Sequence, residues 1–408
     1  MRILLVNKFI FPKGGAETYT FDVGKMLEEH GHEVQYFGLE NEKNTVGNRI
    51  GSYVTNMDFS QGIKANLNAP FRIIYSREAR KKICAVLDDF QPDVVHLNNI
   101  QYHLTPSIIL EINKWRKETK KECKIVYTTH DYQLVCPSHG MFDVNMKPCE
   151  LCLDGHYIHC FQTKCLKNSR AKSLLGTLDG YMWKYSKAYS YVDAYICCSF
   201  FLKSKLDTQK RFRDKTIGLH NFKKEMPHLD NIQKKGYVLE FGHLSRDKGT
   251  DTLLEVAKKM PNTEFVFVGY GPSVDKMKDI PNVNYLGFKT GEELYRIIAE
   301  AAISVCPSEQ YENCPYSVIE SVLLGTPVVG SKMGGIPELI EPGKTGELFE
   351  AGNVEDLMKA IKKVLQTQDV LERYTKNCSQ VKYETTESYY IKLMKIYRGE
   401  KNVEQISS

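Results

Sequence analysis

An alternation of short apolar runs with helically spaced apolar residues constrains this chain more than any other feature, because it is the pattern of a βαβ unit. Residues 3–6 form an apolar run of the fully buried type, and residues 33–37 form another. Between them, a glycine pair at 14–15 precedes apolar side chains at helical spacing, namely Tyr19, Val23, Met26 and Leu27. A strand, a helix and a second strand in this order predict a parallel sheet.

The alternation forms two series along the chain. After strands expected at 94–97 and 124–129, the polar stretch 223–235 precedes a second series, with strands expected at 237–241, 264–268, 303–306 and 327–329. The last helical segment carries Tyr390, Leu393, Met394 and Tyr397 on one face, so it must pack on a core. We therefore expect an α/β fold with two doubly wound domains. Residues 1–220 and a returning helix at 383–408 form the first, and residues 221–382 form the second.

The apolar pattern gives no sign of secretion or of membrane insertion. The run at 3–6 is far shorter than the apolar core of a signal peptide, and no apolar stretch reaches the ~18 residues of a spanning helix. Several of the 12 cysteines, including Cys197, Cys198 and Cys306, lie in apolar runs where a thiol behaves as a small hydrophobe. We expect a cytoplasmic protein without a disulfide framework.

The formal charge of +5 is unevenly distributed. Residues 1–220 hold 31 Lys and Arg against 23 Asp and Glu, whereas residues 221–408 hold 24 against 27. A basic first half favours an anionic partner, either a phosphorylated acceptor or an anionic membrane at the inner face of the plasma membrane, and no motif supports nucleic acid. Ile108, Ile112 and Trp115 could form the apolar face of an interfacial helix, or of an ordinary helix with a basic solvent face.

The densest chemical signal is a pair of glutamates, Glu312 and Glu320, that enclose seven residues where a loop enters a helix. With a proline in the first turn, free backbone N–H groups there favour a bound anion or sugar hydroxyls. A carboxylate accepts two hydrogen bonds at once, which suits the paired hydroxyls of a sugar or a ribose. The other interpretation is two surface acids at a helix start. The loop residues expected to take part are Asn313, Cys314, Pro315, Tyr316 and Ser317.

This segment resembles the Glu-x7-Glu signature of the retaining glycosyltransferases of family 4, which have the GT-B fold of two Rossmann-like domains facing a central cleft. Five further motifs match that family in the same order, and the resemblance covers nearly the whole chain. They are Gly14-Gly15-Ala16-Glu17, Thr129-His130-Asp131, the loop from Gly242 to Gly249, Gly269-Tyr270-Gly271-Pro272, and Gly334-Gly335-Ile336-Pro337-Glu338.

The resemblance implies a role for each matching residue. Glu312 would contact hydroxyls of the donor sugar, Glu320 would hold the nucleotide ribose, and Lys248 would neutralise the diphosphate without a catalytic metal. His130 would be a polar group near the acceptor or the donor sugar, although a hydrogen-bonded core histidine is the other interpretation. Further donor contacts are expected from Gly14, Gly15, His243, Arg246 and Gly271.

The implied reaction moves a sugar, with retention of configuration, from a UDP- or GDP-sugar to a glycan, glycolipid or lipid-linked acceptor in surface polysaccharide synthesis. One departure matters, because His243 stands where the family usually has an arginine. Either Arg246 takes over that phosphate contact or donor binding depends on pH. Two alternatives on the same fold are a sugar-nucleotide epimerase and a non-catalytic nucleotide-sugar-binding subunit.

A cysteine-rich insertion at 136–165 follows His130 and should shape the acceptor side. The C-x2-C spacing of Cys149 and Cys152, with further cysteines on both sides, is typical of a tetrahedral zinc site. The preferred ligands are Cys136, Cys149, Cys152 and Cys165, which leaves Cys160 spare. The other interpretation is a set of reduced thiols that pack the insertion.

Overall fold

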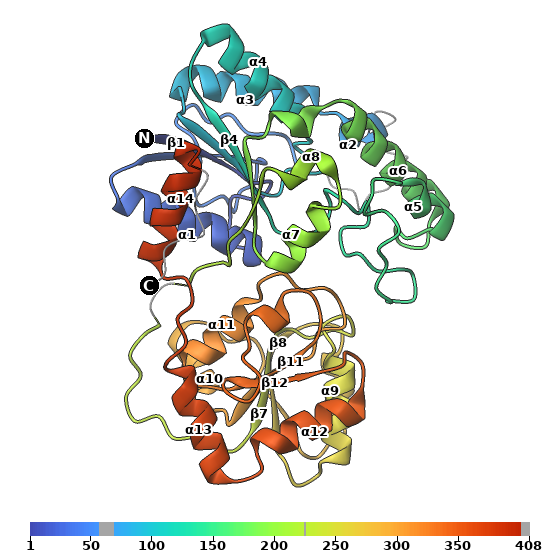
Figure 1. The fold of residues 1–408 in the computed structure, drawn as a ribbon, viewed down its shortest axis with the longest axis vertical. Coiled ribbons are helices and arrows are strands. Elements are labelled where there is room, and N and C mark those ends of the chain that lie inside the picture. The colour runs from blue at the N-terminus through green and yellow to red at the C-terminus, as the bar shows by residue number, and fades with distance from the viewer. Residues whose placement is uncertain (57–68, 224–225, 401–408) are drawn as a thin grey trace. The chain divides into compact units, whose positions relative to one another are not determined.

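The computed structural model describes residues 1–56, 69–223 and 226–400, and the chain divides into two compact units (Figure 1). The first unit holds Met1–Val144, Cys149–Leu219 and the chain from Glu387 onward. The second holds His220–Thr386 together with Asn145–Pro148. Each unit contains one six-stranded parallel sheet, which confirms the expected α/β fold.

The first sheet has the strand order β2-β1-β3-β4-β5-β6, with parallel neighbours throughout. Its strands are β1 Arg2–Val6, β2 Glu33–Phe37, β3 Val94–Leu97, β4 Lys124–Thr129, β5 Ala194–Cys197 and β6 Thr216–Gly218. Burial is nearly complete in β3 and β4, as expected where helices cover both faces. The order reverses between β1 and β3, and ligands of such sheets bind beyond the carboxyl ends of the strands at that point.

Helices of the first unit surround this sheet, with α5 and α6 lying away from its strands (Figure 1). They are α1 Gly15–Glu29, α2 Ala69–Ile74, α3 Arg77–Phe90, α4 Ser107–Thr119, α5 Ile158–Thr163, α6 Arg170–Tyr185, the 3-10 helix η3 Ala188–Tyr191, α7 Phe200–Leu206 and α8 Lys210–Arg213.

On α4, Ile108, Ile112 and Trp115 are buried. The interfacial interpretation of these three side chains is therefore wrong, because the protein core already covers them. Among the described residues, no helix combines the length and apolarity needed to cross a bilayer.

The last helix, α14 (Thr386–Arg398), packs on the first unit, where it lies beside α1 (Figure 1). The hydroxyl of Tyr389 lies 2.6 Å from that of Tyr19 on α1. The hydroxyl of Tyr397 lies 2.7 Å from Nδ1 of His96, and Nε2 of His96 lies 2.7 Å from the hydroxyl of Thr128. A chain of buried polar contacts therefore ties the end of the sequence to the centre of the first sheet.

The second sheet has the order β12-β11-β10-β7-β8-β9, again all parallel. Its strands are β7 Val238–His243, β8 Phe265–Tyr270, β9 Val283–Tyr285, β10 Ile303–Cys306, β11 Val328–Ser331 and β12 Gly346–Phe349. The helices are α9 Thr250–Lys259, η4 Val274–Met277, α10 Gly291–Glu300, α11 Tyr316–Leu323, η5 Ile336–Glu338, α12 Val354–Val364 and α13 Gln368–Cys378. A large apolar cluster joins α9 and α12 to the sheet, and the strand order reverses between β7 and β10.

Burial of His96 predicts an acid-sensitive first unit. Burial lowers the pKa of His96 to about 3, whereas the unfolded residue titrates near its ordinary value. Between these values the unfolded chain binds more protons, so the free energy of unfolding falls as pH falls. His96→Gln should reduce the loss of stability between about pH 7 and about pH 5 by about 2 kcal/mol, measured by urea denaturation.

His228→Gln is the matched control, because His228 is exposed. This variant should lose as much stability as the unsubstituted protein over the same pH range. An equal pH dependence in the His96 variant would contradict the argument.

Candidate functional site

Two loops at the switch point of the second sheet carry the predicted donor-binding residues. One loop follows β7 and ends at Gly249, directly before α9, and the other follows β10 and leads into α11. Because β7 and β10 are neighbouring parallel strands, both loops leave the same edge of the sheet. This topology brings Lys248 of the first loop to Glu312 of the second.

Lys248 and Glu312 form an ion pair. Nζ of Lys248 lies 2.5 Å from Oε1 of Glu312, which also accepts a hydrogen bond of 2.9 Å from the Ser308 hydroxyl. The lysine and glutamate side chains are 32% and 16% exposed, so a ligand can reach them. Burial lowers the pKa of Lys248, but the Glu312 carboxylate raises it, and the resulting pKa lies above its ordinary value. Lys248 is therefore positively charged at neutral pH.

Two glycines allow close backbone contacts with the β10 loop, Gly249 from the loop after β7 and Gly334 from the loop after β11. Gly249 has a φ of +79°, and a Cβ atom there would lie 1.9 Å from the backbone oxygen of Pro307. Gly334 has a φ of +62°, and its Cβ would lie 2.0 Å from the backbone oxygen of Glu312. The N–H of Gly335 donates to that same oxygen at 2.7 Å. Any larger residue at either glycine would displace a loop, so these backbone contacts position the ion pair.

Glu320 lies one turn into α11 and forms a second ion pair. Nζ of Lys223 lies 2.6 Å from Oε1 of Glu320, and both side chains are only 13% exposed. The same ammonium lies over the Tyr316 ring, 5.3 Å from its centroid. Lys223 could not be predicted from the sequence, because no spacing in the chain links this residue to Glu320.

The predicted loop residues surround the start of α11. Pro315 directly precedes the helix instead of forming its first turn, and the first residues of the helix are Tyr316 and Ser317. Cys314 is buried, whereas Asn313 and Ser317 are partly exposed. The free backbone N–H groups of the first turn of α11 therefore lie beside a partly exposed loop. Such N–H groups favour the binding of an anion.

An aromatic cluster continues from the end of β7. His243 is the last residue of that strand and is exposed. Its ring centroid lies 5.3 Å from that of Tyr270, whose centroid lies 5.7 Å from that of Phe288. Tyr270 and Phe288 are 55% and 65% exposed. Three neighbouring aromatic rings are therefore open to a planar ligand.

Arg246 and Gly271 lie around the same loop. Arg246 is exposed and lines a hollow with Asp251, which pairs with Lys276. Gly271 packs against the backbone of Leu244. Arg246 thus has a carboxylate neighbour, and its contact with a donor phosphate stays a prediction.

The first unit carries the other predicted residues. His130 directly follows β4, and its Nε2 lies 2.9 Å from Oδ1 of Asn98. Burial lowers the pKa of His130 to about 4, which makes the ring neutral at physiological pH. The centroid of its ring lies 4.9 Å from that of Tyr19 on α1.

Gly14 and Gly15 begin α1, directly after the loop from β1 at the switch point of the first sheet.

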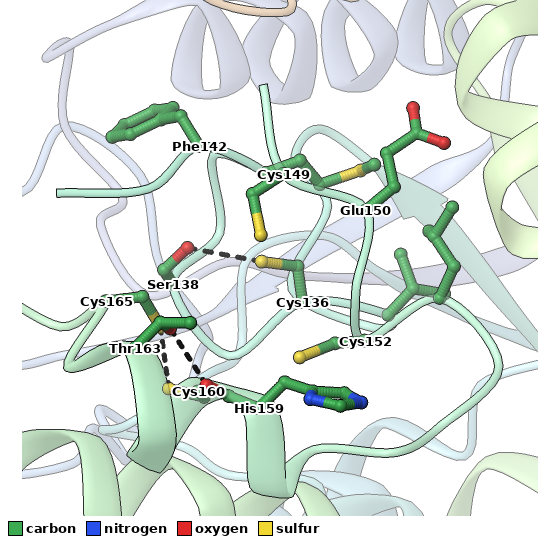
Figure 2. A pocket seen from close by; sticks show the side chains of 13 residues that line it. Cys136, Ser138, Phe142, Cys149, Glu150, Cys152, His159, Cys160, Thr163 and Cys165 are labelled. Atoms are coloured by element: carbon green, nitrogen blue, oxygen red, sulfur yellow. Dashed lines mark hydrogen bonds between the residues drawn. The ribbon is translucent and has the colours of Figure 1, made fainter. Parts of the chain in front are cut away.

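The insertion gathers its five cysteines around one cavity of about 10 Å³, shown in Figure 2. These residues are Cys136, Cys149, Cys152, Cys160 and Cys165, and all are free thiols. The sulfur of Cys165 lies 2.8 Å from that of Cys160. Within the described residues, no three His, Cys, Asp or Glu side chains are arranged to hold a metal as they stand. Zinc binding therefore stays a prediction.

Comparison with protein families gives two matches that together span most of the chain. Residues 13–221 match the family described as Glycosyltransferase Family 4, which is just over half of the chain. Residues 221–381 match the family described as Glycosyl transferases group 1.

Individual relatives agree with these matches. A 42.6 kDa protein from the cps region of Klebsiella pneumoniae is 24% identical over 361 residues, 83% of this chain and 87% of that protein. The amylovoran biosynthesis glycosyltransferase AmsK of Erwinia amylovora is 28% identical over 166 residues, 37% of this chain and 41% of its own length. The solved structure of Anabaena HepE in complex with UDP and glucose has the same fold, with a TM-score of 0.66 at 15% identity over 98% of this chain and 99% of that one.

The contact between Gly249 and Pro307 predicts a specific cost of substitution. Gly249 and Gly236 have nearly the same φ, +79° and +78°, but a Cβ at Gly236 would meet nothing within 4 Å. Gly236→Ala should therefore cost only the left-handed backbone conformation, about 1–2 kcal/mol. Gly249→Ala should cost a further ~1–3 kcal/mol from the forced contact, measured by denaturation of the full chain. Equal losses in the two variants would show that the loops do not touch as described.

Proposed function

This chain belongs to glycosyltransferase family 4, and from that premise we propose that its second unit binds a UDP- or GDP-sugar whose sugar the enzyme transfers with retention of configuration. The observation that carries the proposal is the ion pair of Lys248 and Glu312 at the carboxyl edge of the second sheet. It places a fixed cation and a fixed carboxylate where parallel α/β sheets bind ligands.

The ion pair supports donor binding because it keeps both charged side chains in the site before the donor arrives. Lys248 would then exchange Glu312 for oxygens of the diphosphate, while Glu312 accepts hydrogen bonds from sugar hydroxyls. Negative charge grows on the diphosphate as its bond to the sugar breaks. A cation already in place stabilises that transition state more than the ground state, and the N–H groups at the start of α11 add to this effect.

The exposed aromatic cluster would receive the nucleobase of the donor. His243 opens the loop that carries Lys248, and Tyr270 and Phe288 extend the exposed surface from there. Stacking of a base on an aromatic side chain is worth about 1–3 kcal/mol. In this proposal the imidazole ring of His243 stacks on the nucleobase, and Lys248 and Arg246 contact the phosphates.

For the chemical step, we propose that the leaving diphosphate takes the proton of the acceptor hydroxyl. His130 is neutral at physiological pH, so it would hydrogen-bond a sugar hydroxyl and would not act as a charged acid. Retention predicts that donor and product share the same anomeric configuration, which proton NMR of the isolated product measures.

The acceptor is proposed to be a glycan or lipid-linked saccharide in surface polysaccharide synthesis. Relatives support this class, since one is described by its role in amylovoran biosynthesis and another by its place in a cps region. The basic first half of the chain suits an acceptor that carries phosphate.

The proposed role of the ion pair predicts a large loss of activity. A thermal-shift screen over UDP- and GDP-sugars first identifies the donor, since a ligand at 100 times its Kd stabilises by about 2.7 kcal/mol. Lys248→Met and Glu312→Gln should each lower kcat/KM for that donor by roughly 10²–10³, because each removes a group that stabilises the transition state.

Lys332→Met is the matched control, since Lys332 forms an exposed ion pair with Glu350 in the same unit. That variant should keep full activity. Full activity in the Lys248 and Glu312 variants would contradict the proposal. Conversion of the donor without any acceptor would instead identify an epimerase.

A separate prediction concerns Glu320. If its carboxylate holds the ribose hydroxyls, Glu320→Gln should raise the KM for the donor roughly tenfold, about 1.4 kcal/mol, with little change in kcat. Lys223→Met keeps the carboxylate and should raise KM less. An unchanged KM in the Glu320 variant would remove this residue from the donor site.

A further inference from the structure

The part of the cysteine-rich insertion that precedes α5 has no regular secondary structure to hold it. Between the end of β4 at Thr129 and the start of α5 at Ile158, the described chain forms no helix and no strand. A segment of this kind depends on scattered turn hydrogen bonds and on side-chain contacts, because it has no continuous ladder of backbone hydrogen bonds.

The apolar cluster around the cysteines is small, and cysteines make up half of it, although other apolar side chains of the segment are also buried. Its cluster of buried side chains contains Cys152, Tyr157 and Cys160, and Cys165, Leu166 and Tyr181 pack against it. Small loop-rich segments with so little apolar core are generally stabilised by metals or disulfides.

We propose that Cys136, Cys149, Cys152 and Cys165 bind one structural zinc ion. The four side chains line the cavity of Figure 2 together with Cys160, and thiolates are the ligands that structural zinc prefers. Cys149 and Cys152 have the C-x2-C spacing of such sites.

To bind the ion, the four sulfurs would have to turn toward a common point. The sulfurs of this cluster are not yet arranged as a ligand set. A cysteine sulfur moves by rotation about χ1 between staggered rotamers, while its backbone stays in place. Cys160, whose sulfur lies 2.8 Å from that of Cys165 before any such rotation, is the spare thiol of the cluster.

The zinc would fix the segment that follows His130. Cys136 lies in a closed loop, because its N–H donates to the carbonyl of Tyr132 at 2.8 Å and the N–H of Tyr132 donates to the carbonyl of His139 at 3.1 Å. His139 in turn lies 3.3 Å from the carboxylate of Asp131, the residue directly after His130. Holding Cys136 therefore holds the loop beside a predicted active-site residue.

The competing state of these thiols is a disulfide between Cys160 and Cys165, whose sulfurs are the closest pair. It would use up one proposed ligand, so it and the zinc site exclude each other. Intact mass measured after denaturation without reductant distinguishes them, since a disulfide lowers the mass by two hydrogens.

The test is the metal content of the full chain, purified without a polyhistidine tag from zinc-supplemented cells. We expect about one zinc per chain by elemental analysis, and a protein with all thiols reduced. Cys149→Ser and Cys152→Ser should lower the bound zinc at least roughly tenfold, whereas Cys160→Ser should retain it. Cys84→Ser is the matched control, because Cys84 is a free thiol on α3 outside the cluster.

If the cysteine variants fail to fold, cobalt replaces zinc in the unsubstituted protein. Thiolate ligation then produces intense charge-transfer absorption in the near ultraviolet, which depends on neither activity nor a variant. Absence of stoichiometric zinc together with absence of that absorption overturns the proposal, as does a Cys160–Cys165 disulfide in the purified chain.

Discussion

Backbone contacts between loops, made possible by two glycines, are the constraint on which the site of the second unit depends. Gly249 touches the backbone of Pro307, and Gly334 touches the backbone of Glu312. The first contact draws together the loops that leave β7 and β10 at the switch point of the sheet, and the second holds the β10 loop against the loop that follows β11. The position of the lysine next to Gly249 is therefore a consequence of the topology and of the missing Cβ atoms, more than of any attraction between charges.

The electrostatics follow from that geometry. Taking an ammonium and a carboxylate partly out of water is costly unless each finds a partner, and Lys248 and Glu312 provide this for each other at 2.5 Å. The same holds for Lys223 and Glu320, which are more deeply buried. Both pairs hold their charges in place without a ligand, so in the proposed function donor binding would be an exchange of partners that needs little rearrangement of the protein.

Much of the fold could be predicted from the sequence, because buried parallel strands are continuous apolar runs. The expected strands at 3–6, 33–37 and 124–129 coincide closely with β1, β2 and β4. The spacing of apolar residues could not show what an apolar helix face contacts, so the face that includes Trp115 could be interpreted as membrane-binding. The burial of Trp115 in the core excludes that interpretation. Lys223 was missed because its contact with Glu320 is tertiary and spans 97 positions. The motif loops were recognisable, and Tyr270 lies within one of them, whereas its contact with Phe288, which follows β9, is tertiary and gives no signal in the sequence.

The most direct test of the central claim is a crystal structure of the full chain with its nucleotide-sugar donor bound. The account predicts that Nζ of Lys248 lies about 2.7–2.9 Å from a diphosphate oxygen and that the Glu312 carboxylate accepts hydrogen bonds from the sugar. A diphosphate bound elsewhere, with the Lys248–Glu312 pair intact beside it, would contradict the account.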